Sequence, residues 1–420
     1  MSNTSGYAIT FWGAPPVGHT NEQRYKEIAE AGFTLVTPPL RGPEQNLKHG
    51  SYEENSRILE LCARFGMKAI IEDSRMSLAL EDKENWKSHL DNIVNDYRSH
   101  PALEGYYIFD EPNATMFARL GAITAYLREI DPYHPGYINL FPNYATPEQL
   151  GTQTYREYVE RYVDEVRPEM VSYDHYAMFG QGRSVDKIEI SDNRERLIFE
   201  SNTREERPSF FENIEIVREI SFHHQLPFKA ILLLVAHGAY PSPSEAQLRW
   251  QTFISLAYGA STISYFTYWT PSDEPIWHYR NAMFTWDGKK TDKYDIVLAL
   301  NRELSRLGGF LYNRKSLGIY HVGEEREQVT YFHDTGSIRE IAGGRAVAGY
   351  FEGAYWLIVN KDYERSTELT VTLEDGITAI LVDKITGEER LLALHGNRCT
   401  LTFQPGDAEL LRLEDSRVKR

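Results

Sequence analysis

The sequence predicts an α/β protein, a (β/α)8 or TIM barrel followed by a small C-terminal β-sandwich domain. Its 420 residues are more than one hydrophobic core usually serves, so we expect two domains. Eight short apolar runs alternate with segments that carry helix signals, and from about residue 310 the pattern changes to short strands alone. We therefore assign residues 1–309 to the barrel and residues 310–420 to the sandwich.

The eight predicted barrel strands are short runs rich in β-branched and aromatic residues. They span residues 7–12, 33–37, 67–73, 105–110, 136–141, 170–175, 228–237 and 261–269. The segments between them carry local helix chemistry, since Thr20 with Gln23 and Ser51 with Glu54 are typical of capping boxes. Strand and helix therefore alternate along the first three hundred residues.

Alternating strands and helices form parallel sheets, which leaves a closed barrel or an open doubly wound sheet. The first strand-to-helix turn, residues 12–16, has no G-x-G-x-x-G phosphate cradle and contains two prolines where a cradle needs backbone donors. The barrel is therefore the prediction. Dinucleotide and P-loop fingerprints are lacking elsewhere too, so we expect no cofactor.

The C-terminal part is expected to form a β-sandwich. Residues 354–359, 368–373 and 408–413 are short alternating runs with turn signals between them. A charged, apolar-poor stretch at residues 180–208 is longer than most connections. In a barrel it would follow the sixth strand, as either a lid over the catalytic face or a disordered segment.

Composition excludes several classes of protein. With 41% hydrophobic and 25% charged residues, the chain is neither collagen-like nor mostly disordered. Its 61 acidic against 45 basic side chains give a net charge of −16, so we expect no nucleic-acid and no membrane partner. Two cysteines far apart and a start without a signal-peptide pattern suggest a cytoplasmic protein, although a trimmed signal would look the same. The oligomeric state is open.

A barrel places its active site at the carboxyl ends of its strands, which nominates residues in advance. Four carboxylates stand there: Asp73, Asp110, Glu111 and Asp174. Residues that could bind a substrate accompany them: Trp12, Arg75, Asn143, His175, Tyr176, His237, Tyr268 and Trp269. Because adjacent strand residues point to opposite sides, Asp174 and His175 cannot both face the axis unless the strand bends.

This mixture fits the cleavage of glycosidic bonds. That reaction needs one protonated carboxyl, a second carboxylate that attacks or activates water, and rings that stack on sugars. Glu111 is the best candidate for the acid because Pro112 ends the strand and frees the side chain toward the rim. If Arg75 faces the pocket, it favours an acidic sugar.

The stretch GYYIFDEPN at residues 105–113 resembles the strand-four motif of clan A glycoside hydrolases, in which Asn-Glu-Pro supplies the acid/base glutamate. Asp110 replaces the usual asparagine. Other segments are similar to barrel proteins of the family 42 β-galactosidase type: 139–145, 172–176, 245–251 and 257–269. The resemblance implies a nucleophilic glutamate at the end of strand seven, but His237 stands there. Asp174 is the first replacement, Asp73 the second, and Glu245, which also fits a helix cap, the third.

We therefore expect a glycoside hydrolase that acts on oligosaccharides, with Glu111 as general acid and Asp174 as nucleophile or base. Whether it retains or inverts configuration depends on the separation of the carboxyl groups. Two alternatives stay open: a carbohydrate-binding barrel without catalysis, and a metal-assisted sugar lyase or isomerase. No His-x-His or His-Glu-x-x-His spacing supports a metal, so we expect none.

Overall fold

The computed structural model describes residues 6–40, 50–179, 187–191, 194–198, 205–272, 277–323 and 329–417. The chain divides into two compact units. The first consists mainly of Ala8–Ser242 and Thr262–Leu298, and the second mainly of Pro243–Ser261 and Ala299–Arg420. The domain boundary between residues 309 and 310 stays a prediction from the sequence.

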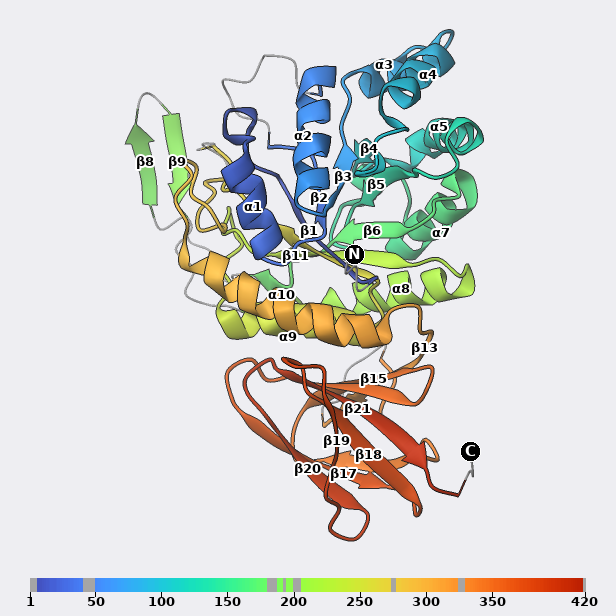
Figure 1. Ribbon diagram of the computed structural model, residues 1–420, viewed down its shortest axis with the longest axis vertical. Helices are drawn as coiled ribbons and strands as arrows, with labels where there is room; N and C mark the ends of the chain where they lie inside the picture. Colours follow the sequence, from blue (N-terminus) through green and yellow to red (C-terminus); the bar gives the residue numbers. More distant parts are fainter. Residues whose placement is uncertain are drawn as a thin grey trace. The chain divides into compact units, whose positions relative to one another are not determined.

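The first unit is a parallel eight-stranded barrel (Figure 1). Its strands are β1 (Ala8–Trp12), β2 (Leu35–Val36), β3 (Lys68–Ile71), β4 (Leu103–Asp110), β5 (Gly136–Leu140), β6 (Val171–Asp174), β11 (Phe228–Leu233) and β12 (Thr262–Phe266). Neighbours pair in chain order, and β12 returns to pair with β1. Backbone bonds from Thr34 N to Ile9 O (2.9 Å) and from Ala14 N to Pro38 O (3.1 Å) complete the ring. The predicted barrel is confirmed.

Helices follow the strands and lie outside the ring (Figure 1). They are α1 (Glu22–Glu30), α2 (Tyr52–Arg64), α3 (Arg75–Glu81), α4 (Trp86–Tyr97), α5 (Phe117–Ile130), α6 (Pro147–Leu150), α7 (Tyr155–Val166) and α8 (Phe210–His223), with short 3-10 turns η1 (Val17–His19) and η2 (Ala114–Met116). Ser51 caps α2 as predicted, because its side chain accepts from Glu54 N. The prediction for α1 was wrong by one residue: Asn21, not Thr20, caps that helix.

Short antiparallel pairs follow the sixth barrel strand. β7 (Met178–Phe179) pairs with β10 (Glu205–Glu206), and β8 (Lys187–Ser191) pairs with β9 (Arg194–Ile198). The remainder of the predicted lid, within residues 180–204, lies outside the described residues. A lid therefore stays a prediction.

Two barrel strands end three or four residues earlier than the sequence predicted. β11 ends at Leu233 rather than residue 237, and β12 ends at Phe266 rather than residue 269. The amides of Leu234 and Val235 both donate to the carbonyl of Phe266, each at 2.8 Å, which interrupts the regular parallel ladder. After each of these two strands the polypeptide leaves the barrel as a loop. Residues beyond Leu233 and Phe266 therefore do not follow strand alternation.

The second unit contains the predicted β-sandwich, with all strand pairs antiparallel. One sheet has the order β13 (Ser316–Val322), β15 (Ala346–Phe351), β16 (Tyr355–Asn360), β21 (Ala408–Asp415), β18 (Ile377–Val382) and β19 (Glu389–Leu391). The other has the order β14 (Ile338–Ala342), β17 (Thr367–Leu373) and β20 (Arg398–Phe403). Their buried core includes Trp356, Val371 and Phe403.

Two helices extend this unit beyond the sandwich. They are α9 (Glu245–Ala257) and the larger part of α10 (Asp292–Leu311). Arg249 of α9 binds Glu303 of α10 at 2.7 Å and Asp407 beside β21 at 2.6 Å. All three side chains are largely buried, so loss of one partner would leave an uncompensated charge. Within the described part of the chain, no helix is both long and apolar enough to span a bilayer.

Candidate active site

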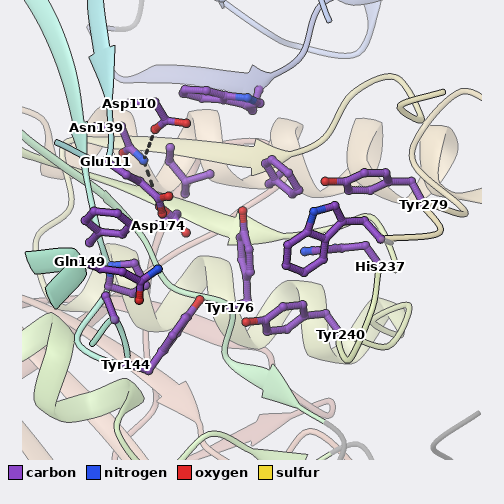
Figure 2. Close-up of a pocket in the computed structure, with 17 residues that line it drawn as sticks. Asp110, Glu111, Asn139, Tyr144, Gln149, Asp174, Tyr176, His237, Tyr240 and Tyr279 are labelled. Atoms are coloured by element: carbon purple, nitrogen blue, oxygen red, sulfur yellow. Dashed lines mark hydrogen bonds between the residues drawn. The ribbon is translucent and has the colours of Figure 1, made fainter. Parts of the chain in front are cut away.

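A cavity of about 350 Å³ opens among the carboxyl ends of the barrel strands. Carboxyl groups lie on one side and aromatic rings on the other (Figure 2). The described lining residues are Trp12, Asp110, Glu111, Asn139, Phe141, Pro142, Tyr144, Ala145, Gln149, Asp174, Tyr176, Ile231, His237, Tyr240, Phe266, Trp277 and Tyr279. Its volume lies in the range of small-molecule sites.

A β-bulge turns Asp110 into this cavity. Along β4 and β5, Tyr107 faces Tyr137 and Phe109 faces Ile138, so Ile108 is an extra residue that shifts the register. Asp110 therefore lies opposite Asn139 on the inward side of the sheet, where strict alternation from Tyr107 would place Phe109. Asp110 is exposed to the cavity, whereas Asp174, at the end of β6, is buried.

Glu111 has an unusual backbone. Its φ of +49° lies in the left-handed region, which is costly for a residue with a Cβ atom. Its amide donates to the carbonyl of Asn139 at 2.8 Å, and Pro112 follows. This turn directs the Glu111 side chain into the cavity beside Asp174. Strained conformations that the surrounding structure maintains are common at functional sites.

Asn139 joins two of the carboxylates through one amide nitrogen. Its Nδ2 donates to Asp110 Oδ1 at 3.2 Å and to Asp174 Oδ1 at 2.9 Å (Figure 2). Its Oδ1 accepts from Ser172 Oγ at 2.9 Å, and Ser172 shares a 2.8 Å hydrogen bond with the Tyr137 hydroxyl. The serine fixes the orientation of the amide, so the NH2 group faces the acids.

The three carboxyl groups all have raised pKa values, and that of Glu111 is raised most. Burial, then the negative charges of Asp174 and Asp110, raise the pKa of Glu111 well above its usual range, and a hydrogen bond to Asp174 acts in the same direction. Burial and the charge of Asp110 also raise the pKa of Asp174. Desolvation at the cavity wall raises the pKa of Asp110 to about 6, and the hydrogen bond from the Asn139 amide acts in the opposite direction. Glu111 therefore has the highest pKa of the three carboxyl groups.

Aromatic rings form the opposite wall of the cavity. Tyr176 lies edge-on to His237 and Tyr240, with centroids 5.3 and 5.1 Å apart. His237 stacks on Tyr279 at 5.2 Å. Because a carbonyl can only accept, His237 Nδ1, which is 3.0 Å from Val235 O, carries the proton and leaves Nε2 as an acceptor. Burial lowers the pKa of His237 to about 4, so the ring is neutral near pH 7.

Asp73 and Arg75, two predicted site residues, do not join the carboxyl cluster. Arg75 donates to both oxygens of Asp73 through Nε and Nη2, each at 2.8 Å, and Nη2 also donates to Asp96 at 2.7 Å. Tyr97 donates to the second oxygen of Asp73 at 2.8 Å. The two charges neutralise each other, and neither side chain lines the cavity that holds Glu111.

Four other predicted residues lie away from the cavity. Asn143 is bonded to the start of α8, through Asn213 and the Ser209 carbonyl. His175 points outward among Tyr144 and Phe210, and burial lowers its pKa. Tyr268 and Trp269 lie beyond the end of β12 and are buried against Phe284. The cavity is lined by Trp12, Tyr176 and His237 from the predicted binding set.

Sequence reasoning missed several residues that line the cavity. Asn139 had a signal, since it is an inward-facing amide on a predicted strand. The others come from loops or from α6, where alternation gives no guidance: Tyr144, Gln149, Tyr240, Trp277 and Tyr279. Among the described residues, no group of three or more His, Cys, Asp or Glu side chains has the arrangement of a metal site.

No family model matches the sequence, and no curated protein is similar to it. Solved structures do match the fold. One described as a glycoside hydrolase has a TM-score of 0.60 and 12% identity, covering 98% of this chain and 93% of its own. An α-amylase of Anoxybacillus has a TM-score of 0.52 and 10% identity, covering 97% and 98%. A β-galactosidase of Halorubrum lacusprofundi has a TM-score of 0.49 and 13% identity, covering 71% and 58%. The first two of these matches show that the chain has a barrel fold that glycoside hydrolases also have, as its resemblance to clan A implied.

Proposed function

We propose that the protein is a glycoside hydrolase that cleaves oligosaccharides by paired-carboxylate chemistry. The observation that carries this proposal is one cavity in which a proton-holding Glu111 lies beside two further acids and faces a wall of rings. Glycosidic cleavage needs such a proton donor, a second carboxylate and ring surfaces for the sugar. The fold of the solved glycoside hydrolase structure supports the same class of reaction.

Glu111 is the general acid in this proposal. Its raised pKa keeps it protonated near neutrality, which a donor to the leaving oxygen requires. The second carboxylate must lie across the sugar, about 5 Å away in retaining enzymes and farther in inverting ones. Asp174 lies beside Glu111, close enough to raise its pKa, rather than across the cavity from it. Asp110, exposed to the cavity, is therefore the carboxylate that attacks the anomeric carbon or activates water.

Asp174 becomes a positioning residue in this arrangement. It is buried, accepts from Asn139, and holds its negative charge beside Glu111. That charge opposes ionisation of Glu111 and so keeps the acid protonated. This role differs from the nucleophile or base that the sequence suggested for Asp174.

One observation favours a second candidate, a carbohydrate-binding barrel without catalysis. The chain beyond β11 presents the neutral His237 to the cavity, where clan A enzymes are expected to present a glutamate. Such a protein would bind sugars through its rings but turn none over.

Glu111→Gln separates the two candidates. In an enzyme, the variant loses about 10²–10⁴-fold in kcat on glycosides with poor leaving groups. It loses far less on dinitrophenyl glycosides, because their leaving group needs no proton. Both losses in kcat are measured by screening aryl glycosides and oligosaccharides with the wild type and this variant in parallel. Sugar binding by a wild type that cleaves none of these substrates would instead support the binding protein.

A further inference from the structure

A second cavity, of about 560 Å³, lies next to the first on the β2 and β3 side of the barrel mouth. Its walls come from the chain after β2, the chain after β3, the helix α3 and residues 107–110 of β4. Leu40, Met76 and Leu80 supply apolar surface, and Ser74 and Ser77 supply hydroxyl groups. Apolar surface with a few polar groups is typical of ligand sites.

The two cavities share Trp12 and Asp110 among their lining residues. The Trp12 ring packs edge-on to Tyr107 at 5.9 Å, which holds it at the boundary. Asp110, the carboxylate proposed to meet the anomeric carbon, lies at the same boundary. A chain molecule bound across both cavities would thus pass directly over the reacting group.

Charge limits what this chain molecule can be. None of the described residues that line either cavity is lysine or arginine, whereas five are acidic: Glu72, Asp73, Asp110, Glu111 and Asp174. Arg75 neutralises Asp73, and Glu111 is protonated, so the negative charge comes from the other three. The nearby Arg75 is occupied by Asp73 and Asp96. Arg207 stacks on the lining rings of Tyr144 and Tyr240 but does not itself line the cavity. A uronic acid or a sulfated sugar would bring its negative charge next to like charges without a cation among the described lining residues, which is unfavourable.

We propose that the second cavity binds additional sugar units of the substrate, so that the protein acts on neutral oligosaccharides that span both cavities. This inference rests on the proposed function. Units beyond the cleaved bond lie against Trp12 and the apolar wall of Leu40, Met76 and Leu80. Each unit seated there adds binding energy that a disaccharide or a small aryl glycoside does not provide.

The test compares two tryptophan substitutions on the same helix. Leu80→Trp fills the second cavity, whereas Leu78→Trp adds the same ring at a neighbouring position that is 48% exposed and lines neither cavity. The substrates are neutral cello-, manno-, xylo- and galacto-oligosaccharides from disaccharide to pentasaccharide, with oligogalacturonides as the anionic probe. Two quantities are measured: kcat/KM for each variant, and the Kd of each oligosaccharide in the Glu111→Gln background.

For the neutral series that the protein accepts, we expect kcat/KM to rise about tenfold or more from disaccharide to pentasaccharide. The rise in kcat/KM disappears in Leu80→Trp and persists in Leu78→Trp. Likewise, the Kd falls with chain length in Leu78→Trp but not in Leu80→Trp. Oligogalacturonides bind weakly to every variant. If Leu80→Trp fails to fold, Ser77→Trp, at an exposed position of the same wall, takes its place.

The outcomes separate this inference from the proposed function. Aryl glycoside turnover without any dependence on chain length would overturn the second site and leave the hydrolase standing. The second site would also be overturned if kcat/KM depended equally on chain length in Leu80→Trp and Leu78→Trp. Preferred binding of oligogalacturonides over neutral oligosaccharides would overturn it as well. If nothing is cleaved but Kd still falls with length in Leu78→Trp and not in Leu80→Trp, the second site stands and the hydrolase fails.

Discussion

The two sides of the cavity are built in different ways. The acids are carried by strand ends: Asp110 and Asp174 are set by the ladder and joined by the Asn139 amide. The rings of Tyr240, Trp277 and Tyr279 lie on loops after β11 and β12. Groups that react must be held in a fixed geometry, whereas groups that only stack tolerate small displacements. We therefore expect changes on the acid side to lower kcat and changes on the aromatic side to raise KM.

The largest effect is expected for Asp110→Asn. The variant keeps the side-chain shape but removes the carboxylate that meets the anomeric carbon, so kcat should fall about 10³-fold for good and poor leaving groups alike. The matched control is Asp164→Asn, which changes an exposed position of α7 and should leave kcat unaltered. Steady-state kinetics check both. Full activity of Asp110→Asn would show that the exposed acid is not part of the reaction.

An intermediate effect is expected for Asp174→Asn, and it concerns pH. Ionised Asp174 raises the pKa of Glu111, so removal of its charge lowers that pKa. Glu111 then loses its proton at lower pH, and the alkaline limb of the kcat/KM profile moves down by about 1–3 pH units. A nucleophile at this position would behave differently, since kcat would collapse at every pH.

The smallest effect is expected on the aromatic side, for Trp277→Ala. The ring lies on a loop beside His237, with centroids 6.0 Å apart, and is 43% exposed. Its loss should raise KM about fivefold, equivalent to about 1 kcal/mol, with little change in kcat. Trp286→Ala is the control, because that ring is similarly exposed at 39% but does not line the cavity. Equal effects of the two variants on KM would contradict a stacking role for Trp277.

The same contrast explains what the sequence could predict. Strand periodicity and the alternation of side chains locate the barrel, Glu111 and Asp174, and they correctly imply that His175 faces away from Asp174. The inward turn of Asp110 depends on a bulge, which no local pattern marks.

Loop residues follow no period, so the sequence could not predict which of them reach the cavity. Tyr268 and Trp269 illustrate this limit. They were placed at the rim because the eighth strand was drawn three residues too long, and beyond Phe266 the chain turns their rings toward Phe284. Tyr240 and Tyr279, which do line the cavity, carry no sequence signal that distinguishes them.

We expect Glu111 to hold a proton near neutrality, because it lies half-buried beside Asp174 and Asp110. Carbon-13 NMR of protein labelled at the glutamate carboxyl groups tests it without any substrate. We predict one resonance that stays in the protonated range at about pH 7, far above the ordinary glutamate pKa, and that is missing from Glu111→Gln. If every glutamate resonance instead completes its titration near the ordinary pKa, the acid assigned here does not exist.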